Sequence, residues 1–354
     1  MDTLSYRGHI PALDGLRGVA ILLVLLRHFY LEQPMLAAYS STGPFITKLA
    51  LAGNYGVELF FVLSGFLITG ILLESRRNTN YFCAFYARRF LRIFPLYYAT
   101  LAIVLLAMPH FVSFDSPAQS ISSRQGWLWS YLSNAPWSGG GWDKSNLFRL
   151  GHFWSLCVEE HFYIVWPLLV YLFSPKALLK LCVSLIGISI ILRVAHSLSG
   201  IPLLGWSTLT KLDGLALGSL LAVAVRQPEV REWLRLKLFW VFLGSGLLFF
   251  TMILLPRRLG SAWYWGLNET VSVVFFGALL ISALGVKGWF PAVMRHPVLR
   301  SFGKYSYGIY VIHNLCLPLF ERLFQPLAIM EASGSPLLGQ ALYYALTLLG
   351  SWKK

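Results

Sequence analysis

One apolar stretch of the sequence carries two side chains that could do chemistry. The segment LDGLRGVAILLVLLRHF, residues 13–29, holds Arg17 near its start and His28 deep in its apolar run. The two positions are 11 residues apart, which in a helix is about 20° from three full turns and a rise of about 16 Å. Both side chains therefore share one helix face at different depths. A histidine there suits a general base, because imidazole exchanges protons near neutral pH.

Carboxylates are expected at a similar depth on two further helices. Glu58 lies near the start of NYGVELFFVLSGFLITG, and Glu159 and Glu160 lie in GHFWSLCVEEHFYIVWP. Ser155 precedes Glu159 by one helical turn and shares its face. Ionisable groups inside a membrane usually face the bundle interior and mark a functional path. We expect His28, Glu58 and one of the two adjacent glutamates to form a site in the outer half of the membrane. The alternative is a polar cluster that only holds helices together.

A cluster of arginines points to a second kind of chemistry. FYARRFLRIFPLYY contains Arg88, Arg89 and Arg92, which we expect at the start of the third membrane helix on the inner side. Forked guanidinium donors and the open backbone N–H groups of a helix N-terminus both favour anions. The cluster therefore predicts a phosphate dock. The alternative, accepted for Arg76 and Arg77, is that these cations only anchor a helix at the inner face.

The composition indicates what must position these residues. The chain has 354 residues, 56% hydrophobic and 12% charged, and that charged share is about half of what soluble domains carry. This composition predicts an all-α protein, a polytopic transmembrane helix bundle. The net charge of +14 comes from cations between apolar segments, so we expect the lipid bilayer and no nucleic acid as a partner. Four scattered cysteines predict neither a disulfide framework nor a metal site.

About ten segments are long and apolar enough to cross a bilayer. They lie near 12–32, 54–74, 93–112, 153–173, 177–197, 210–226, 234–255, 265–285, 304–324 and 335–351, the last being the weakest. Most Lys and Arg residues fall in the connections that a cytoplasmic N-terminus places inside, which predicts that both termini are cytoplasmic. The first segment is expected to be retained rather than cleaved as a signal peptide. The outer loop 113–152 is rich in tryptophan, which fits either an interfacial belt or a platform for a sugar ring.

Six motifs together resemble the membrane-bound acyltransferase 3 family, bacterial integral-membrane O-acyltransferases that modify surface polysaccharides and some small molecules. The resemblance covers nearly the whole chain, and the motifs stand in the family's order. They are LDGLRGVAILLVLLRHF, GVELFFVLSGFLITG, ARRFLRIFPLYY, FWSLCVEEHFYIVWP, LDGLALGSLLA and FGKYSYGIYVIH. Within them, Arg17, His28 and Glu58 meet the family's basic, histidine and acidic positions, and Arg89 and Arg92 meet its Arg-x-x-Arg motif.

The resemblance implies an acyl-CoA donor, most often acetyl-CoA, as a co-substrate, with no permanently bound cofactor. Its phosphates would dock from the cytoplasm at Arg88, Arg89 and Arg92. His28 would be the general base or would carry the acyl group itself, with Glu58 orienting it and Arg17 contacting the donor. The residues expected to shape the acceptor side are Ser64, Trp154, Ser155, Glu159 and Glu160.

The implied acceptor is a hydroxyl of a cell-surface glycan, in lipopolysaccharide, exopolysaccharide or peptidoglycan, or of a small glycosylated molecule. The expected location is the bacterial inner membrane. The sequence ends at LTLLGSWKK without the family's acidic residue and proline, so we expect a truncated or divergent end. We expect residues 1–354 to form a single membrane domain without a soluble extracytoplasmic domain. Outer loops or a partner protein would then present the acceptor.

Two other functions fit part of the pattern. A proton-coupled transporter also places Glu and His inside the membrane, although matched inverted halves with broken helices are not evident in the sequence. A scaffold or receptor would use the same polar residues only for packing. Two smaller interpretations concern late motifs: His313 is interpreted as a packed histidine with a hydrogen-bond partner, and Lys211 and Asp213 as a structural pair.

Overall fold

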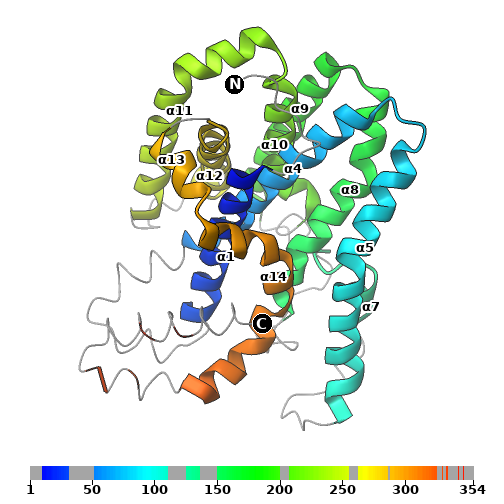
Figure 1. Ribbon diagram of the computed structural model, residues 1–354, viewed down its shortest axis with the longest axis vertical. Coiled ribbons are helices and arrows are strands. Elements are labelled where there is room, and N and C mark those ends of the chain that lie inside the picture. Colours follow the sequence, from blue (N-terminus) through cyan, green and yellow to red (C-terminus); the bar gives the residue numbers. More distant parts are fainter. Residues whose placement is uncertain are drawn as a thin grey trace. The chain divides into compact units, whose positions relative to one another are not determined.

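The computed structural model describes residues 10–31, 52–110, 125–135, 150–199, 207–254, 262–285 and 288–324, together with residues 329, 332, 333, 342 and 346. Within these ranges the regular elements are helices, and no strand occurs (Figure 1). The chain divides into two compact units. Unit 1 comprises Met1–Ile10 and Glu58–Pro291, and unit 2 comprises Pro11–Val57 and Ala292–Lys354.

Unit 2 is built on two long helices, α1 (Pro11–Leu31) and α14 (Pro297–Phe324). Their backbones touch at glycines. A Cβ atom at Gly18 would collide with the backbone carbonyl of Leu299, and one at Gly303 with that of Asp14. Small residues at helix contacts let backbones approach closely. Inside a membrane the hydrophobic effect does not drive helices together, so this close packing is a main source of their association. This contact aligns α1, which carries His28, against α14, which carries His313.

Unit 1 contains the remaining helices, of which α4 and α13 extend into residues of unit 2. They are α4 (Tyr55–Ser75), α5 (Tyr81–Leu101), α7 (Gln125–Trp129), α8 (Trp154–Leu172), α9 (Pro175–Ser199), α10 (Leu212–Ala224), α11 (Pro228–Leu254), α12 (Ala262–Ala283) and α13 (Trp289–Met294). A π-helix, η1 (Ala102–Ala107), continues α5, and a 3-10 turn, η5 (Thr208–Lys211), precedes α10. Helix α10 packs against α9 and α12, and α11 packs against α12.

Helix α8 is fixed to α4 and α5 by hydrogen bonds from aromatic side chains. Trp166 Nε1 donates to Thr69 Oγ1 of α4 at 2.8 Å. Tyr81 and Tyr86 of α5 donate their hydroxyls to the carbonyls of Pro167 and Ile164 at 3.0 and 2.7 Å. Pro167 lies inside α8, and a proline inside a helix leaves a carbonyl one turn earlier without its helical donor. The Tyr86 hydroxyl bonds the Ile164 carbonyl in that turn. These contacts hold the glutamates of α8 in place.

The first nine segments predicted to cross the membrane all carry helices. Three of these helices begin earlier than predicted: the third at Tyr81 and not near 93, the seventh at Pro228 and not near 234, and the ninth at Pro297 and not near 304. A hydropathy count excludes the arginines from the helix, whereas the backbone remains helical through them. The tenth segment, 335–351, lies outside the described residues except for 342 and 346.

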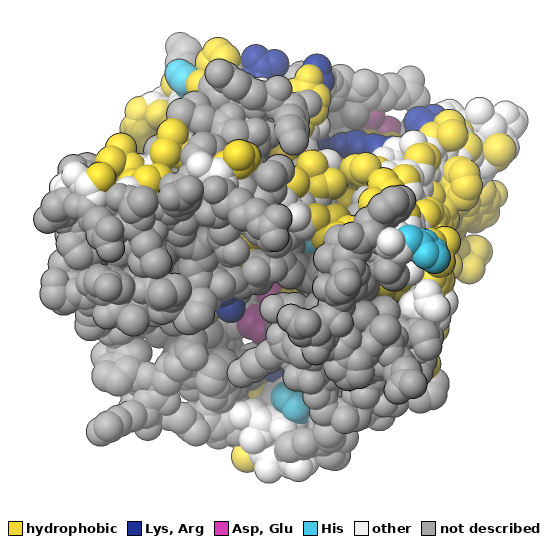
Figure 2. All heavy atoms as spheres, turned by 90° about the horizontal axis from the view of Figure 1, so that it is seen from below, with side chains coloured by type: hydrophobic (Ala, Val, Ile, Leu, Met, Phe, Trp, Pro, Cys, Tyr) yellow, Lys and Arg dark blue, Asp and Glu magenta, His cyan; other side chains and the backbone are white. Residues whose placement is uncertain are grey.

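Five of the described helices are long and apolar enough to cross a membrane, or six if a pair bent by 115°, Thr208–Ala224 with Pro228–Leu234, counts as one. Helix α1 does not meet this criterion because Asp14, Arg17 and Arg27 interrupt its apolar run. Hydrophobic side chains cover much of the described surface in the view of Figure 2. On α11, Phe239 and Trp240 are 63% and 65% exposed, as expected of side chains that face lipid.

Candidate functional site

The two histidines singled out in the sequence lie side by side in unit 2. His313 Nε2 is 3.2 Å from His28 Nδ1, and the ring centroids are 4.8 Å apart in an edge-to-face arrangement. His313 is 2% exposed, and its Nδ1 lies 2.7 Å from the carbonyl oxygen of Tyr310. The expectation that His313 is a packed histidine with a hydrogen-bond partner is thus correct. The sequence did not predict that this partner is His28.

Two arginines of α1 have local polar neighbours. Arg17 lies 3.7 Å from Asp14, one turn earlier, and its side chain is 24% exposed. Arg27 donates a hydrogen bond of 2.9 Å to Asn54, just before α4. The predicted contact between Arg17 and an acyl donor is not tested by these observations and remains a prediction.

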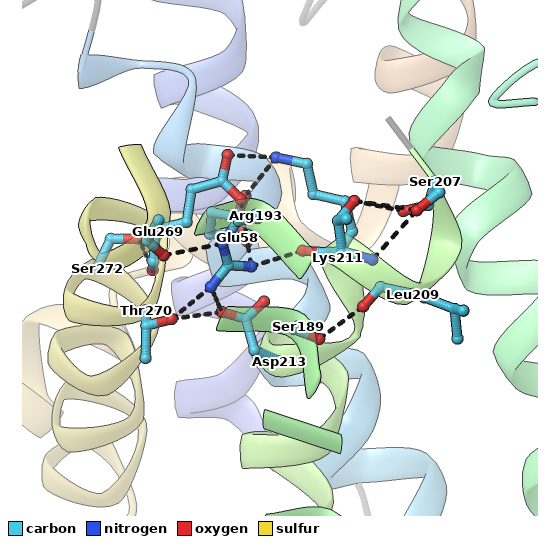
Figure 3. A network of polar contacts seen from close by, with 12 residues as sticks. Glu58, Ser189, Arg193, Ser207, Leu209, Lys211, Asp213, Glu269, Thr270 and Ser272 are labelled. Carbon is cyan, nitrogen blue, oxygen red and sulfur yellow. Dashed lines mark hydrogen bonds and ion pairs between the residues drawn. The ribbon is translucent and has the colours of Figure 1, made fainter. Parts of the chain in front are cut away.

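Unit 1 contains a largely buried group of charges, here called the charged network (Figure 3). Its members are Glu58 of α4, Arg193 of α9, Lys211 of η5, Asp213 of α10 and Glu269 of α12. Arg193 pairs with Asp213 at 2.7 Å and with Glu269 at 3.5 Å. Lys211 pairs with Glu269 and lies 4.0 Å from Glu58. Five elements are therefore tied together by ionic contacts.

The expected pairing of Lys211 with Asp213 was wrong. Asp213 pairs with Arg193, which also donates to the carbonyl oxygen of Gly266 at 3.1 Å. Lys211 instead reaches Glu58 and Glu269. The reason is local geometry, since residues two apart at a helix start point to different faces.

Glu58 has a buried carboxylate oxygen whose hydrogen-bonding capacity is not used among the described residues. It is 5% exposed, and its Oε2 atom has no hydrogen-bond partner among the described residues. Lys211 also lies over the ring of Trp154 at 5.6 Å from its centroid, and Trp154 packs edge-to-face on Phe61. Trp154 therefore belongs to the surroundings of the charged network, beside Glu58.

A second polar group, here called the α4–α8 cluster, comprises Ser64, Arg89, Glu159, Glu160 and Tyr163. Ser64 donates a hydrogen bond of 2.7 Å to Glu159 Oε1. The Arg89 guanidinium lies over the Tyr163 ring at 3.3 Å from its centroid and interacts electrostatically with Glu160, which is 7% exposed. The structure thus pairs Ser64 with Glu159 and places Arg89 near Glu160, and the predicted role of these residues in shaping the acceptor site remains a prediction.

Ser155 has a different kind of hydrogen-bond partner from Glu159, which lies one turn later on the same helix. It is 4% exposed and donates its hydroxyl to the carbonyl of His152 at 3.1 Å. This bond closes the turn that starts α8, so in this structure the hydroxyl donates a hydrogen bond to the backbone.

The arginines of α5 separate into two environments. Arg88 and Arg92 are exposed, whereas Arg89 turns inward against Tyr163. Because α5 begins at Tyr81, all three lie about two to three turns inside the helix. The backbone N–H groups there are already bonded within the helix, so the argument from a helix N-terminus was wrong. The guanidinium groups of Arg88 and Arg92 remain a predicted anion dock.

His28 belongs to unit 2 and Glu58 to unit 1, so the predicted orientation of His28 by Glu58 remains a prediction. Sequence reasoning also missed Arg193 and Glu269 as members of a buried network. A signal was present, because each interrupts an apolar helix, in IGISIILRVAH and in GLNETVSVVFFGALL. An isolated ionisable residue in such a run needs a partner.

In the part of the chain that the structure describes, these features define a helical protein with hydrophobic side chains on its surface and ionisable side chains buried between its helices. The chain belongs to the acyltransferase family: the model of the acyltransferase domain matches residues 10–352. No solved structure matches the chain.

Curated relatives agree with this family. The O-acetyltransferase OatA of Staphylococcus aureus (strain NCTC 8325 / PS 47) is 28% identical over 322 residues, which covers 86% of this chain and 50% of that protein. The putative O-acetyltransferase SACOL0978 of S. aureus (strain COL) is 28% identical over 324 residues, with the same coverage of 86% and 50%. The peptidoglycan O-acetyltransferase OatA of Listeria monocytogenes is 30% identical over 192 residues, 51% of this chain and 28% of that protein. The chain spans about half the length of the first two relatives.

Proposed function

We propose that the protein is a membrane O-acetyltransferase that moves an acetyl group from cytoplasmic acetyl-CoA to a hydroxyl of a cell-envelope glycan. The observation that carries the proposal is His28 on α1, backed by His313, in a chain of the acyltransferase family. The names of the relatives favour a sugar hydroxyl of peptidoglycan as the first acceptor to test. Lipopolysaccharide, exopolysaccharide and small glycosylated acceptors are the other members of this class.

The proposed setting is the bacterial inner membrane, with about ten membrane helices and both termini in the cytoplasm. The excess of Lys and Arg in the connections assigned to the inner side supports this orientation. The donor would then arrive at the inner end of α5, where Arg88 and Arg92 are exposed. Arg89 stacks on Tyr163. In the proposal it therefore fixes the side chains of the α4–α8 cluster in place and does not bind a phosphate.

In the proposed reaction, the imidazole of His28 takes the proton of the acceptor hydroxyl while the oxygen attacks the thioester carbonyl. The carbon–sulfur bond breaks, and the sulfur of CoA leaves with the electron pair and receives the proton. In the second version of the reaction, the acetyl group first bonds to the imidazole and is then passed to the hydroxyl. Both versions need His28 with a lone pair on one ring nitrogen.

The acceptor side is proposed to include Trp154 and Glu58. Oε2 of Glu58 is buried without a hydrogen-bond partner among the described residues; in the proposal, the site opens as the acceptor enters, a sugar hydroxyl donates to this oxygen, and Trp154 offers an aromatic face. The α4–α8 cluster would shape the wall beside them through Ser64, Glu159 and Glu160. The transporter alternative is not favoured, because the family match and the relatives' names concern acyl transfer.

Acetyl transfer by purified protein tests the proposal. We expect wild-type protein in nanodiscs to release CoA from radiolabelled acetyl-CoA and to move the label to peptidoglycan fragments. His28→Ala should lower turnover by a factor of about 10² to 10⁴, the range for loss of a general base. His110→Ala is a matched control, because His110 is exposed beyond α5, and it should retain full turnover.

The readouts separate the alternatives. Unchanged melting of His28→Ala with lost transfer supports the enzyme. If wild-type protein neither binds acetyl-CoA nor releases CoA with any glycan pool, the donor assignment is wrong and proton-coupled transport becomes the better reading. If His28→Ala lowers the protein yield and the melting temperature together with the turnover, the result supports the alternative in which the protein is a scaffold and His28 serves only for packing.

A further inference from the structure

His313 contacts the His28 ring directly, and its position bears on which nitrogen of His28 reacts. The ring lies in α14, is 2% exposed, and packs beside Phe29 with centroids 6.4 Å apart and beside Tyr310 with centroids 5.7 Å apart. Dense packing of this kind fixes the orientation of a ring. Which of its nitrogens carries a proton then follows from the hydrogen bonds around it.

The protonation of His313 follows from its contact with Tyr310. A backbone carbonyl can only accept hydrogen bonds. His313 Nδ1, which lies 2.7 Å from the Tyr310 carbonyl oxygen, must therefore carry the hydrogen. In neutral imidazole the other nitrogen is then an acceptor, so Nε2 of His313 presents a lone pair toward His28.

The protonation of His28 follows in turn. Its Nδ1 lies 3.2 Å from His313 Nε2 and 3.0 Å from the carbonyl oxygen of Val24. Both neighbours accept, so Nδ1 of His28 carries the hydrogen. The Val24 carbonyl is also the helical acceptor for the backbone N–H of His28, whereas His313 is an acceptor that comes from another helix, α14.

We propose that His313 is a positioning residue that holds His28 as the Nδ1–H tautomer, so that Nε2 of His28 is the atom that receives the acceptor's proton. The inference rests on the proposed function. As the acceptor O–H bond breaks, the proton moves to His28 Nε2, and it passes to the CoA sulfur when the carbon–sulfur bond breaks. During the intervening imidazolium stage, Nδ1–H still donates to His313, and that bond strengthens because its donor is charged.

A pair of amide variants tests the proposal. The side-chain oxygen of Gln reaches about as far as histidine Nε2, whereas that of Asn reaches only about as far as Nδ1. We expect His313→Gln to keep an acceptor at His28 and to retain kcat within a few-fold. His313→Asn should lose that acceptor, and kcat should fall by about tenfold or more at nearly unchanged KM for acetyl-CoA, as for loss of a hydrogen bond to a charged group.

Nitrogen-15 NMR of histidine-labelled protein gives a readout that packing alone would not move. The His28 signals are assigned by their loss in His28→Phe. In the wild type and in His313→Gln we expect the hydrogen on Nδ1, and in His313→Asn a population with the hydrogen on Nε2. Melting temperature shows whether the two amide variants are equally folded.

The outcomes distinguish the inference from the proposed function. If His28 carries its hydrogen on Nε2 in the wild type, or if His313→Asn leaves the tautomer unchanged, the positioning role of His313 is overturned while acetyl transfer stands. If the tautomer shifts and turnover does not, the assignment of His28 as the base is overturned.

Discussion

At the residue scale, Arg193 shows how a buried charge is kept inside an apolar protein. It is 6% exposed and contacts groups from three other elements: Asp213 of α10, Glu269 of α12 and the Thr210 carbonyl of η5. Removing a guanidinium from water costs several kcal/mol, and paired charges and hydrogen bonds offset most of that cost. The network is thus sensitive to loss of one member.

Loss of this guanidinium should destabilise the protein strongly. Arg193→Met leaves the carboxylate of Asp213, which is 0% exposed, without its ion-pair partner. We expect a loss of about 3 to 5 kcal/mol, the usual cost of breaking a buried pair, measured as thermal or chemical unfolding in detergent. The matched control is Arg77→Met, because Arg77 is exposed, and surface substitutions stay within about 0.5 kcal/mol. Equal melting of both variants would show that the network does not hold the helices.

At the element scale, glycines set how closely helices approach. The backbone of α1 meets that of α14 at Gly18 and Gly303, and α4 meets α10 at Gly65 and Gly218. In each case the neighbouring atom is a backbone carbonyl, which cannot rotate away as a flexible side chain does. The distance between two helices, and hence the distance between His28 and His313, therefore depends on residues with no side chain.

A methyl group at this contact should separate the two helices. Gly18→Ala is expected to cost about 1 to 3 kcal/mol through overpacking and to lower turnover as His28 moves away from His313. In Gly187→Ala, on α9, the added Cβ would have nothing within 4 Å, so helix propensity should raise stability by up to about 1 kcal/mol. Opposite signs in melting temperature would bear out the contact; a stabilised Gly18→Ala would contradict it.

At the scale of the whole molecule, the sequence predicts the helices better than their partners. Apolar runs identify α4 and α9 to within two residues at each end, and ionisable residues inside the runs of α1 and α4 identify His28 and Glu58 as candidates. The sequence could not predict that Lys211 contacts Glu269 instead of Asp213, because pairing depends on how two helices are rotated about their axes. The inward turn of Arg89 was missed for the same reason, as its partner Tyr163 comes from another helix.

Membrane orientation is a prediction for the molecule as a whole, and the chain contains a probe for it. Cys83 is exposed in the first turn of α5, beside the arginines assigned to the inner face, whereas Cys157 and Cys182 are buried. In a variant with the other cysteines replaced, a membrane-permeant maleimide should label Cys83 in intact cells and an impermeant one should not. Labelling by both reagents in inverted vesicles is the control. Labelling of intact cells by the impermeant reagent would reverse the orientation.

The pairing of α1 with α14 also constrains the order of events during synthesis. His28 and His313 are 285 residues apart, so at about 5 to 20 residues per second a ribosome needs about 15 to 60 s to make the second after the first. Throughout that interval the His28 side chain of the nascent α1 has no His313 to contact. The histidine pair can form only after α14 has been inserted, so a chain interrupted by a premature stop codon before that helix would lack it.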